Sequence, residues 1–263
     1  MLSKSRQMYP TAELIWAWTY RIVRARYQQS ALGGAWAIIQ PTASAGVFTM
    51  IFTFFIPIDT GAVPYMVFSY VAMVPWTLLS SAMPDMIESL TGNMNLVSKI
   101  YFPRETLPIS AMLARLIDFA IAFVCVAFLI AYFHMPVWVL GWLFLPVILT
   151  IQLLLILGLG LAGAALNVFY RDVRHIFILG LQLWFYASPI IYPVSVVENH
   201  LGSNSYLYYL NPMSGIIEAY RAVLLHGQFP GPSLVLSAAV ALTLFAVGFW
   251  LFKRVEFQFA DVV

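Results

Sequence analysis

Charged residues are scarce in this sequence. The chain has 263 residues, of which 62% are hydrophobic and only 9% are Asp, Glu, Lys or Arg. Soluble domains carry about 25% charged residues, so the composition excludes an ordinary soluble domain and predicts an integral membrane protein. The net charge of +2 says little, because in membrane proteins the distribution of charge matters more than its sum.

Motifs for chemistry are also missing. The three lysines are not in a glycine-rich phosphate loop, which excludes ATP binding by a Walker A motif. The four histidines have no metal-ligand spacing, and the lone Cys125 cannot form an internal disulfide. No acidic residue lies clearly mid-span, as a proton relay requires, and Asp118 is expected to pair with Arg115 one turn away. We therefore expect passage of a substrate rather than catalysis.

Long apolar runs are what the sequence does have. A spanning helix needs about 20 mostly apolar residues, and six segments qualify. They are Ala35–Ile58, Tyr65–Met86, Ile109–Phe133, Val137–Leu166, Ile176–Tyr192 and Leu234–Phe252. The fifth is short and ends in "SPIIYP", where proline stops or kinks a helix. The predicted fold class is an all-α integral membrane protein with six transmembrane helices.

The basic residues indicate the orientation of these spans. Lys and Arg precede the first span, flank the loop between the second and third, lie between the fourth and fifth, and follow the sixth. In a six-span topology all of these positions fall on one side, and only Arg221 falls on the other. The positive-inside rule makes the basic side cytoplasmic. Both termini are therefore predicted to be cytoplasmic.

The segment before the first span, "TAELIWAWTYRIVRARYQQ", has a different pattern. Its apolar residues cover one broad face of a helical wheel, its polar residues cover the other, and Arg26 does not fit either face. This pattern predicts an N-terminal amphipathic helix lying on the cytoplasmic membrane surface. The alternative is a soluble-facing cap helix packed on the rest of the protein.

The stretch between the fifth and sixth spans is too interrupted to cross a membrane and too apolar to be solvated. It contains "YLYYLNPMSGIIEAYRAVLL", which predicts a re-entrant pair of short helices covered by protein. Asn211 is expected to cap the second helix and Pro212 to begin it. Glu218 and Arg221 are spaced to pair across one turn, and these four residues are predicted to form an outer gate. The alternative is a surface helix with aromatic anchors.

Two cytoplasmic loops mix aromatic and basic residues. They are "NLVSKIYFPRETLP", Asn95 to Pro108, and "NVFYRDVRH", Asn167 to His175. Together with the amphipathic helix they are predicted to form a docking face. Anchoring to the membrane surface by basic residues is the alternative.

Six stretches carry a family resemblance. They are "RARYQQSALGGAWAIIQP", "YFPRETLPIS", "NVFYRDVRH", "LQLWFYASPIIYPVS", "LNPMSGIIEAYRAVLL" and "VEFQFADVV". In this order the chain resembles the transmembrane subunit of ABC-2 type exporters of cell-surface polysaccharide, such as O-antigen, capsule or teichoic acid. The resemblance implies one transmembrane domain over residues 1–263 in a bacterial inner membrane. The interfacial helix would occupy residues 1–31, the six spans 32–252 and a cytoplasmic tail 253–263.

The resemblance also implies partners. In the family, the loop after the second span is a coupling helix, here Leu96–Arg104, that sits in a cleft of a separate ATPase subunit. The implied assembly has two copies of this chain and two ATPases, which bind ATP and Mg, and it contacts membrane lipid and a lipid-linked polysaccharide but no nucleic acid. The implied coupling residues are Leu96, Lys99, Tyr101, Phe102, Pro103, Arg104, Tyr170, Arg171 and Asp172.

The family further implies a translocation path lined by the first and fifth spans. Leu32 and Gly33 would lie at its cytoplasmic entrance. Sugar C–H faces can slide along aromatic rings, although rings at these positions could instead pack helices or face lipid. The expected path residues are Trp36, Phe48, Phe52, Trp184, Phe185 and Tyr186.

Three other functions are weighed against polysaccharide export. An ABC-2 permease for a small lipid or drug has the same fold, and fold alone does not assign function. A secondary transporter would usually show paired repeats and intramembrane charges. A membrane-bound transferase or hydrolase would need an acid–base constellation, and none is evident. The strings "YFPR", "RDV" and "SPIIYP" favour polysaccharide export.

Overall fold

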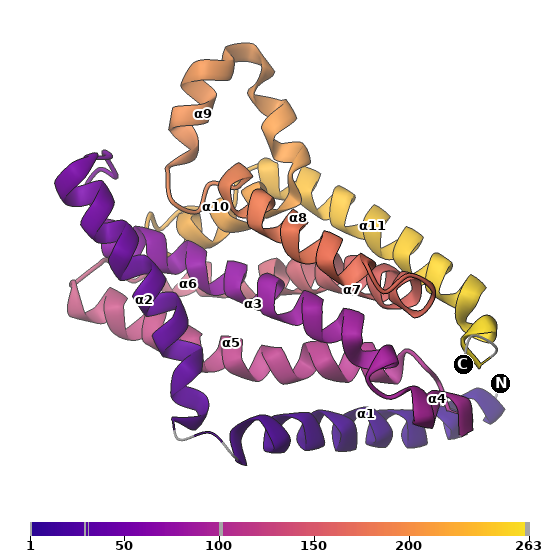
Figure 1. Cartoon of the computed structure of the whole chain (residues 1–263). Coiled ribbons are helices and arrows are strands. Elements are labelled where there is room, and N and C mark those ends of the chain that lie inside the picture. Colours follow the sequence, from indigo (N-terminus) through magenta and orange to yellow (C-terminus); the bar gives the residue numbers. More distant parts are fainter. Residues whose placement is uncertain (1, 29, 31, 100–101, 261–263) are drawn as a thin grey trace.

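The chain folds into a bundle of α-helices (Figure 1). The computed structural model describes residues 2–28, 30, 32–99 and 102–260, and within these residues it contains helices and connecting turns only. The α-helices are α1 (Leu2–Gln28), α2 (Trp36–Met50), α3 (Tyr65–Thr91), α4 (Met94–Lys99), α5 (Thr106–Tyr132), α6 (Val139–Trp142), α7 (Leu145–Phe169), α8 (Val173–Ala187), α9 (Val194–Leu201), α10 (Pro212–Leu224) and α11 (Ser233–Val255). Short 3-10 or π turns are η1 (Gly33–Ala35), η2 (Ile51–Phe55), η3 (Gly202–Leu210) and η4 (Glu256–Ala260).

Five segments are long and apolar enough to cross a membrane, which confirms a multi-pass helical protein. They are Gly33–Phe55, Tyr65–Thr91, Thr106–Tyr132, Val139–Phe169 and Ser233–Phe259. They correspond to five of the six predicted spans. The remaining prediction, Ile176–Tyr192, falls on α8, which has 15 residues. At 1.5 Å per residue α8 is about 22 Å long, because Ser188 leaves the helical conformation just before Pro189.

α3 lies at the centre of the bundle and is buried along most of its length. A polar contact fixes it to two neighbours. Gln152 of α7 donates to the carbonyl of Pro75 in α3 at 2.7 Å and accepts from the Tyr220 hydroxyl of α10 at 3.2 Å. Within an apolar bundle these two hydrogen bonds of Gln152 help to specify how α3, α7 and α10 are arranged.

α7 and α11 approach each other closely because glycine lies at their crossing. A Cβ added at Gly248 of α11 would overlap the backbone of Gly158 in α7, and a Cβ at Gly158 would lie 2.6 Å from the Leu244 backbone. Small residues allow helix backbones to approach closely in membrane proteins. The α7–α11 pair therefore tolerates no larger residue at the crossing.

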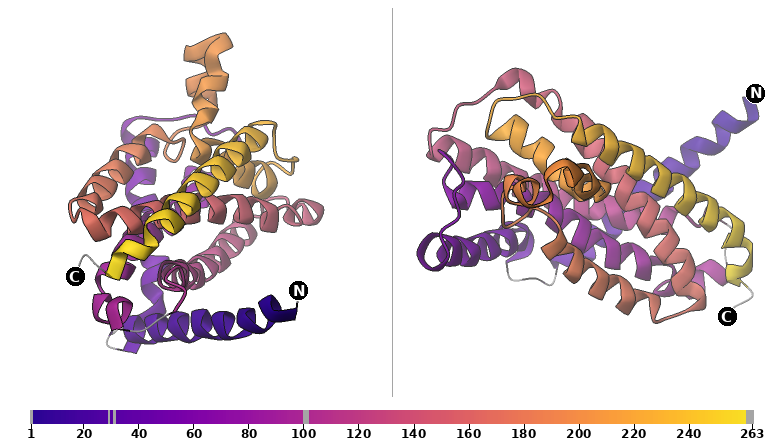
Figure 2. Two further views of the ribbon diagram at one scale, coloured as in Figure 1. Left: turned by 90° about the vertical axis from the view of Figure 1, so that its right-hand side faces the viewer. Right: turned by 90° about the horizontal axis from the view of Figure 1, so that it is seen from above.

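The outer segment between α8 and α11 has two parts. α9 and η3 form a hairpin that projects from the bundle, whereas α10 lies within it (Figures 1 and 2). As predicted, the chain breaks at Asn211–Pro212, where the Asn211 side chain accepts a hydrogen bond from the Met213 amide at 3.1 Å. Of the two short helices predicted here, α10 is the buried one, because its Met, Ile and Tyr side chains pack between α3, α7 and α11.

α1 lies along α5 at one edge of the bundle, and its first residues point away from the other helices (Figure 2). The Ser110 hydroxyl of α5 donates to the carbonyl of Ile15 at 3.0 Å, and Thr19 is buried at the contact. Trp16 and Tyr20 face outward. The face of α1 that packs on the bundle therefore contains both polar and apolar residues, and two large aromatic residues of α1 remain exposed.

Candidate functional site

Both predicted docking loops lie at the end of the bundle that carries η4 (Figure 1). Each packs through an aromatic residue, Phe102 and Phe169, against a small hydrophobic cluster that we call the second core. The second core consists of Leu90, Val97, Leu107, Leu161, Ala164, Ala165, Val168, Phe252 and Phe259. The loops are therefore held in fixed positions relative to each other.

The predicted coupling residues of the first loop differ in accessibility. Lys99 and Pro103 are exposed, whereas Leu96 and Phe102 are half-buried. Tyr101 lies outside the described residues. Arg104 donates a hydrogen bond to the backbone carbonyl of Glu256 and lies 5.8 Å from the Phe259 ring centroid. The Arg104 guanidinium is thus already engaged within the chain.

The second loop offers a more accessible surface. Tyr170 is 68% exposed, and Arg171 and Asp172 are exposed beside it. α8 begins at Val173, and Arg174 in its first turn forms an ion pair with Glu88 near the end of α3. This ion pair holds the loop beside α3. The side chains of Tyr170, Arg171 and Asp172 remain available to a partner.

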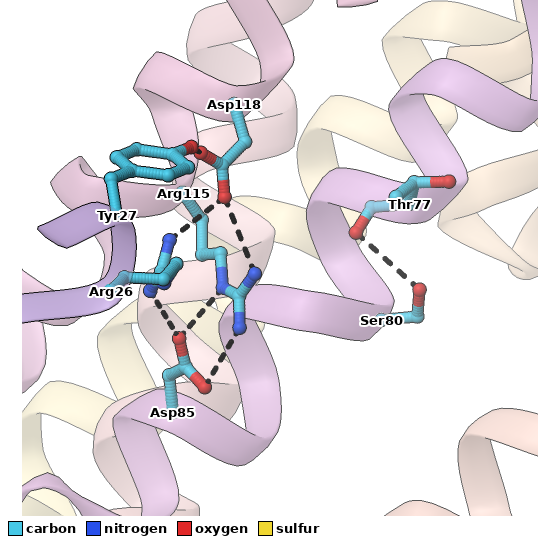
Figure 3. Close-up of polar contacts among 7 residues, drawn as sticks. All are labelled: Arg26, Tyr27, Thr77, Ser80, Asp85, Arg115 and Asp118. Atoms are coloured by element: carbon cyan, nitrogen blue, oxygen red, sulfur yellow. Dashed lines mark hydrogen bonds and ion pairs between the residues drawn. The ribbon is translucent and has the colours of Figure 1, made fainter. Parts of the chain in front are cut away.

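An ionic network joins α1, α3 and α5, and Figure 3 shows its members. Arg26 of α1 contacts Asp85 of α3 at 2.9 Å and Asp118 of α5 at 2.8 Å. Arg115 donates two hydrogen bonds to Asp85, at 2.7 and 3.2 Å, and contacts Asp118 at 3.3 Å. The predicted Arg115–Asp118 pair is confirmed. The misfit of Arg26 in the amphipathic pattern is explained too, because its side chain faces the bundle.

Tyr27 completes this network by donating its hydroxyl hydrogen to Asp118. Burial and this hydrogen bond raise the pKa of Tyr27 to about 12. Tyr27 is therefore protonated at neutral pH and remains a donor. The two guanidinium groups balance the charge of the two carboxylates. Through Arg26 and Tyr27 this network attaches the end of α1 to the bundle.

A cavity of about 100 Å³ lies beside the network. It is lined by Gly33, predicted at the entrance, and Trp36, predicted for the path, together with Arg26 and Tyr27 of α1 and residues of α2, α3 and α5. Gly33 has φ +49°, a conformation that glycine adopts without strain, and it allows the sharp turn from α1 into α2. Leu32, the other predicted entrance residue, is exposed beside this turn.

The predicted path aromatics divide into two groups. Phe48 packs against Phe52 and Phe185, with ring centroids 6.2 and 5.9 Å apart. Trp184 and Phe185 both meet the ring of Trp76 edge-on, at 6.1 and 5.6 Å. These residues form one aromatic cluster between α2, α3 and α8, whereas Trp36 lies at the other end of α2 beside the cavity.

Sequence reasoning missed Trp76, the α3 residue that Trp184 and Phe185 both contact. It lies within a continuous apolar run of α3, and no local pattern sets it apart from its neighbours. Tyr186 lies at the edge of the cluster with its ring exposed. A crevice of about 410 Å³ between α3 and α8 is lined by Trp76, Phe185 and Tyr186 together with polar Ser80 and Gln182.

The predicted gate residues are connected to this cluster. Trp184 donates its indole N–H to the Asn211 side chain at 2.7 Å, and Asn211 in turn donates to the Ser188 hydroxyl at 3.0 Å. Arg221 and Glu218 pair at 3.0 Å as predicted. Asn211 therefore ties the end of α8 to the start of α10.

Arg221 is nearly inaccessible, with 1% of its side chain exposed. It also donates to the Ile190 carbonyl at 2.9 Å, and its guanidinium lies 3.6 Å from the centroid of the Phe68 ring. A buried guanidinium requires such compensation. Arg221 is thus part of the protein interior, whereas its partner Glu218 is 28% exposed.

These features define a class of protein. The chain is a multi-pass helical membrane protein with two loops at one end, a cavity beside the ionic network of α1 and an aromatic cluster between its helices. In the part of the chain that the structure describes, no group of three His, Cys, Asp or Glu side chains could hold a metal ion.

Comparison with known proteins establishes the family. The family model described as ABC-2 type transporter matches residues 13–225, and the chain belongs to this family. Its members are transport subunits without catalytic activity that work with a separate ATP-binding subunit.

Two kinds of curated relative match over nearly their whole length. An O-antigen export system permease protein of Myxococcus xanthus is 29% identical over 265 residues, covering 100% of both chains. A Klebsiella pneumoniae protein of the same name is 26% identical over 248 residues, covering 93% of both. The polysialic acid transport protein KpsM of Escherichia coli is 25% identical over 244 residues, covering 90% of this chain and 91% of KpsM.

Proposed function

We propose that this chain is the permease subunit of an ATP-driven exporter that moves a lipid-linked cell-surface polysaccharide across a bacterial inner membrane. The observation that carries the proposal is the alignment along the entire chain with an O-antigen export permease. The aromatic cluster between α2, α3 and α8 supports it, because flat rings with few charges suit a sliding sugar chain.

The proposed assembly contains two copies of this chain and two ATPase subunits, which bind ATP and Mg. In each copy α8 and the turn after it complete a sixth span, and both termini lie in the cytoplasm. α1 rests on the cytoplasmic membrane surface, with Trp16 and Tyr20 available to the lipid interface. Two bundles can enclose a wider path than one, which suits a polymer.

Within this assembly the cavity beside Gly33 is the proposed cytoplasmic entrance, and the aromatic cluster lines the path. Trp36, at the start of α2, lines this entrance, and Phe48 of the aromatic cluster lies near the other end of the same helix. At the outer end α9, η3 and α10 act as the gate. The hydrogen bond between Trp184 and Asn211 couples the lining of the path to this gate.

The ATPase is proposed to dock on the exposed residues of the two loops, which include Lys99 and Pro103 in the first loop and Tyr170, Arg171 and Asp172 in the second. Tyr170→Asp would place a charge in the contact and is expected to reduce co-purification of the ATPase. Tyr206→Asp is the matched control, because Tyr206 is 60% exposed but lies on the outer hairpin. Equal co-purification with both variants would show that this loop surface is not part of the docking site.

Export itself is tested by deleting the gene in the native cell. The expected result is loss of one surface polysaccharide and its accumulation inside the cell, both reversed by a plasmid copy of the gene. Normal surface polysaccharide together with a change in a small lipid or in drug resistance would refute the proposal and support a small-molecule permease.

A further inference from the structure

The η4 segment folds back onto the bundle instead of leaving it. Phe259 is fully buried, and its ring centroid lies 5.6 Å from that of Phe252 in α11 and 6.0 Å from that of Phe169 in the second docking loop. Phe257, two residues earlier, is 77% exposed. One short segment thus places one phenylalanine in the second core and another outside it.

Polar contacts attach the same segment to the first docking loop. Lys253 lies 2.9 Å from Glu105 and 3.1 Å from Glu256. Arg104 donates to the carbonyl of Glu256 and lies over the Phe259 ring. These five residues (Arg104, Glu105, Lys253, Glu256 and Phe259) form what we call the η4 clamp.

We propose that the η4 clamp positions the docking loop and carries its displacement to α11, so that Arg104 is a positioning residue rather than a direct ATPase contact. This inference rests on the proposed function. Energetic coupling between distant sites needs a continuous physical connection. Here the loop is joined by hydrogen bonds and ion pairs to the end of α11, and α11 is in backbone contact with α7 at Gly158 and Gly248.

The geometry also explains why the loop before α5 needs this support. Pro103 lacks an amide hydrogen and cannot continue α4, and α5 begins only at Thr106. The carbonyls of Pro103, Arg104 and Glu105 accept hydrogen bonds from amides of α5, and side-chain contacts with other segments add to these. The second core supplies the apolar contacts, through Phe102, and the η4 clamp supplies the polar ones.

The first test compares Phe259→Ala with Phe257→Ala in the full permease–ATPase complex. We expect Phe259→Ala to retain the ATPase on co-purification while the polymer exported per ATP hydrolysed falls about fivefold or more, the lower end of typical site couplings. Phe257→Ala is expected to match the wild type. Normal export per ATP in Phe259→Ala, or an equal loss in both variants, would overturn the clamp.

The second test holds even if Phe259→Ala fails to accumulate. Glu105→Lys and Lys253→Glu each place like charges together, and both are expected to lower export per ATP. The exchange restores opposite charges at positions 105 and 253 but leaves a like charge at Glu256, which also pairs with Lys253. The rescue variant therefore adds Glu256→Gln to the exchange and should regain most of the coupling. A triple variant as poor as either single change would overturn the clamp.

The two proposals fail in different ways. If the wild-type chain neither binds an ATPase nor exports a polymer, the proposed function is wrong. If the wild type does both and the charge exchange gives no rescue, only the clamp is wrong.

Discussion

The buried pair of Arg221 and Glu218 gives the sharpest prediction about stability. Arg221 is 1% exposed and Glu218 is 28% exposed. Glu218→Ala leaves the guanidinium in the protein interior with only the Ile190 carbonyl and the Phe68 ring as partners. We expect this single change to destabilise the chain more than removing both charges.

The magnitude follows from these surroundings. Breaking a buried ion pair by removing one partner costs about 3–5 kcal/mol. Because Glu218 is partly exposed and the guanidinium keeps two other contacts, we expect the lower limit, about 3 kcal/mol. That corresponds to about 6–12 °C in the unfolding midpoint. In Glu218→Ala/Arg221→Met the charge is gone, and the main loss is the unpaired Ile190 carbonyl, about 1–3 kcal/mol.

The assay is thermal unfolding of the purified chain in detergent. The control is Arg254→Met, because Arg254 also stacks on an aromatic ring, that of Trp250 at 5.1 Å, but is exposed. We expect the decrease in unfolding midpoint to be smallest for Arg254→Met, larger for the double variant and largest for Glu218→Ala. A small drop for Glu218→Ala, equal to that of the control, would show a hydrated pair and refute the reasoning.

Three further predictions concern packing, the ionic network and topology. Gly248→Leu should prevent stable folding because α11 touches the α7 backbone there, whereas Gly46→Leu, with open space around its Cβ, should fold normally, as judged by yield in detergent. Asp118→Asn should weaken the attachment of α1 and increase protease cleavage near residue 28; unchanged cleavage would contradict this role of the network. In a cysteine-free background, a cysteine at His134 should react with an impermeant reagent from outside and one at Arg171 should not; the reverse would overturn the proposed orientation.

Much of the fold could be predicted from the sequence because helices in lipid must be long and apolar. Five of the six predicted spans are long helices of the structure. The break at Asn211–Pro212 was also predictable, since a cap residue followed by proline is a local signal. The projection of the α9–η3 hairpin could not be predicted, because no local pattern shows which segments the other helices cover.

The candidate site was less predictable, because its partners come from distant segments. Arg26 stood out only as a misfit, and its two carboxylates lie 59 and 92 residues away in the sequence. Arg104 resembled an interface residue by its neighbours, yet its partner Glu256 is 152 residues away. Trp76 had no local signal at all. Local patterns identified such residues or their segments, but only the packing of helices shows which groups they contact.

The central claim is ATP-driven export, and transport by purified components tests it most directly. The chain and its ATPase are reconstituted into liposomes with the lipid-linked polysaccharide on the ATPase side, and polymer protected inside the lumen is measured. We predict protection that requires ATP hydrolysis, is absent without this chain and falls with Phe259→Ala. Polymer movement independent of this chain or of ATP hydrolysis would contradict the account.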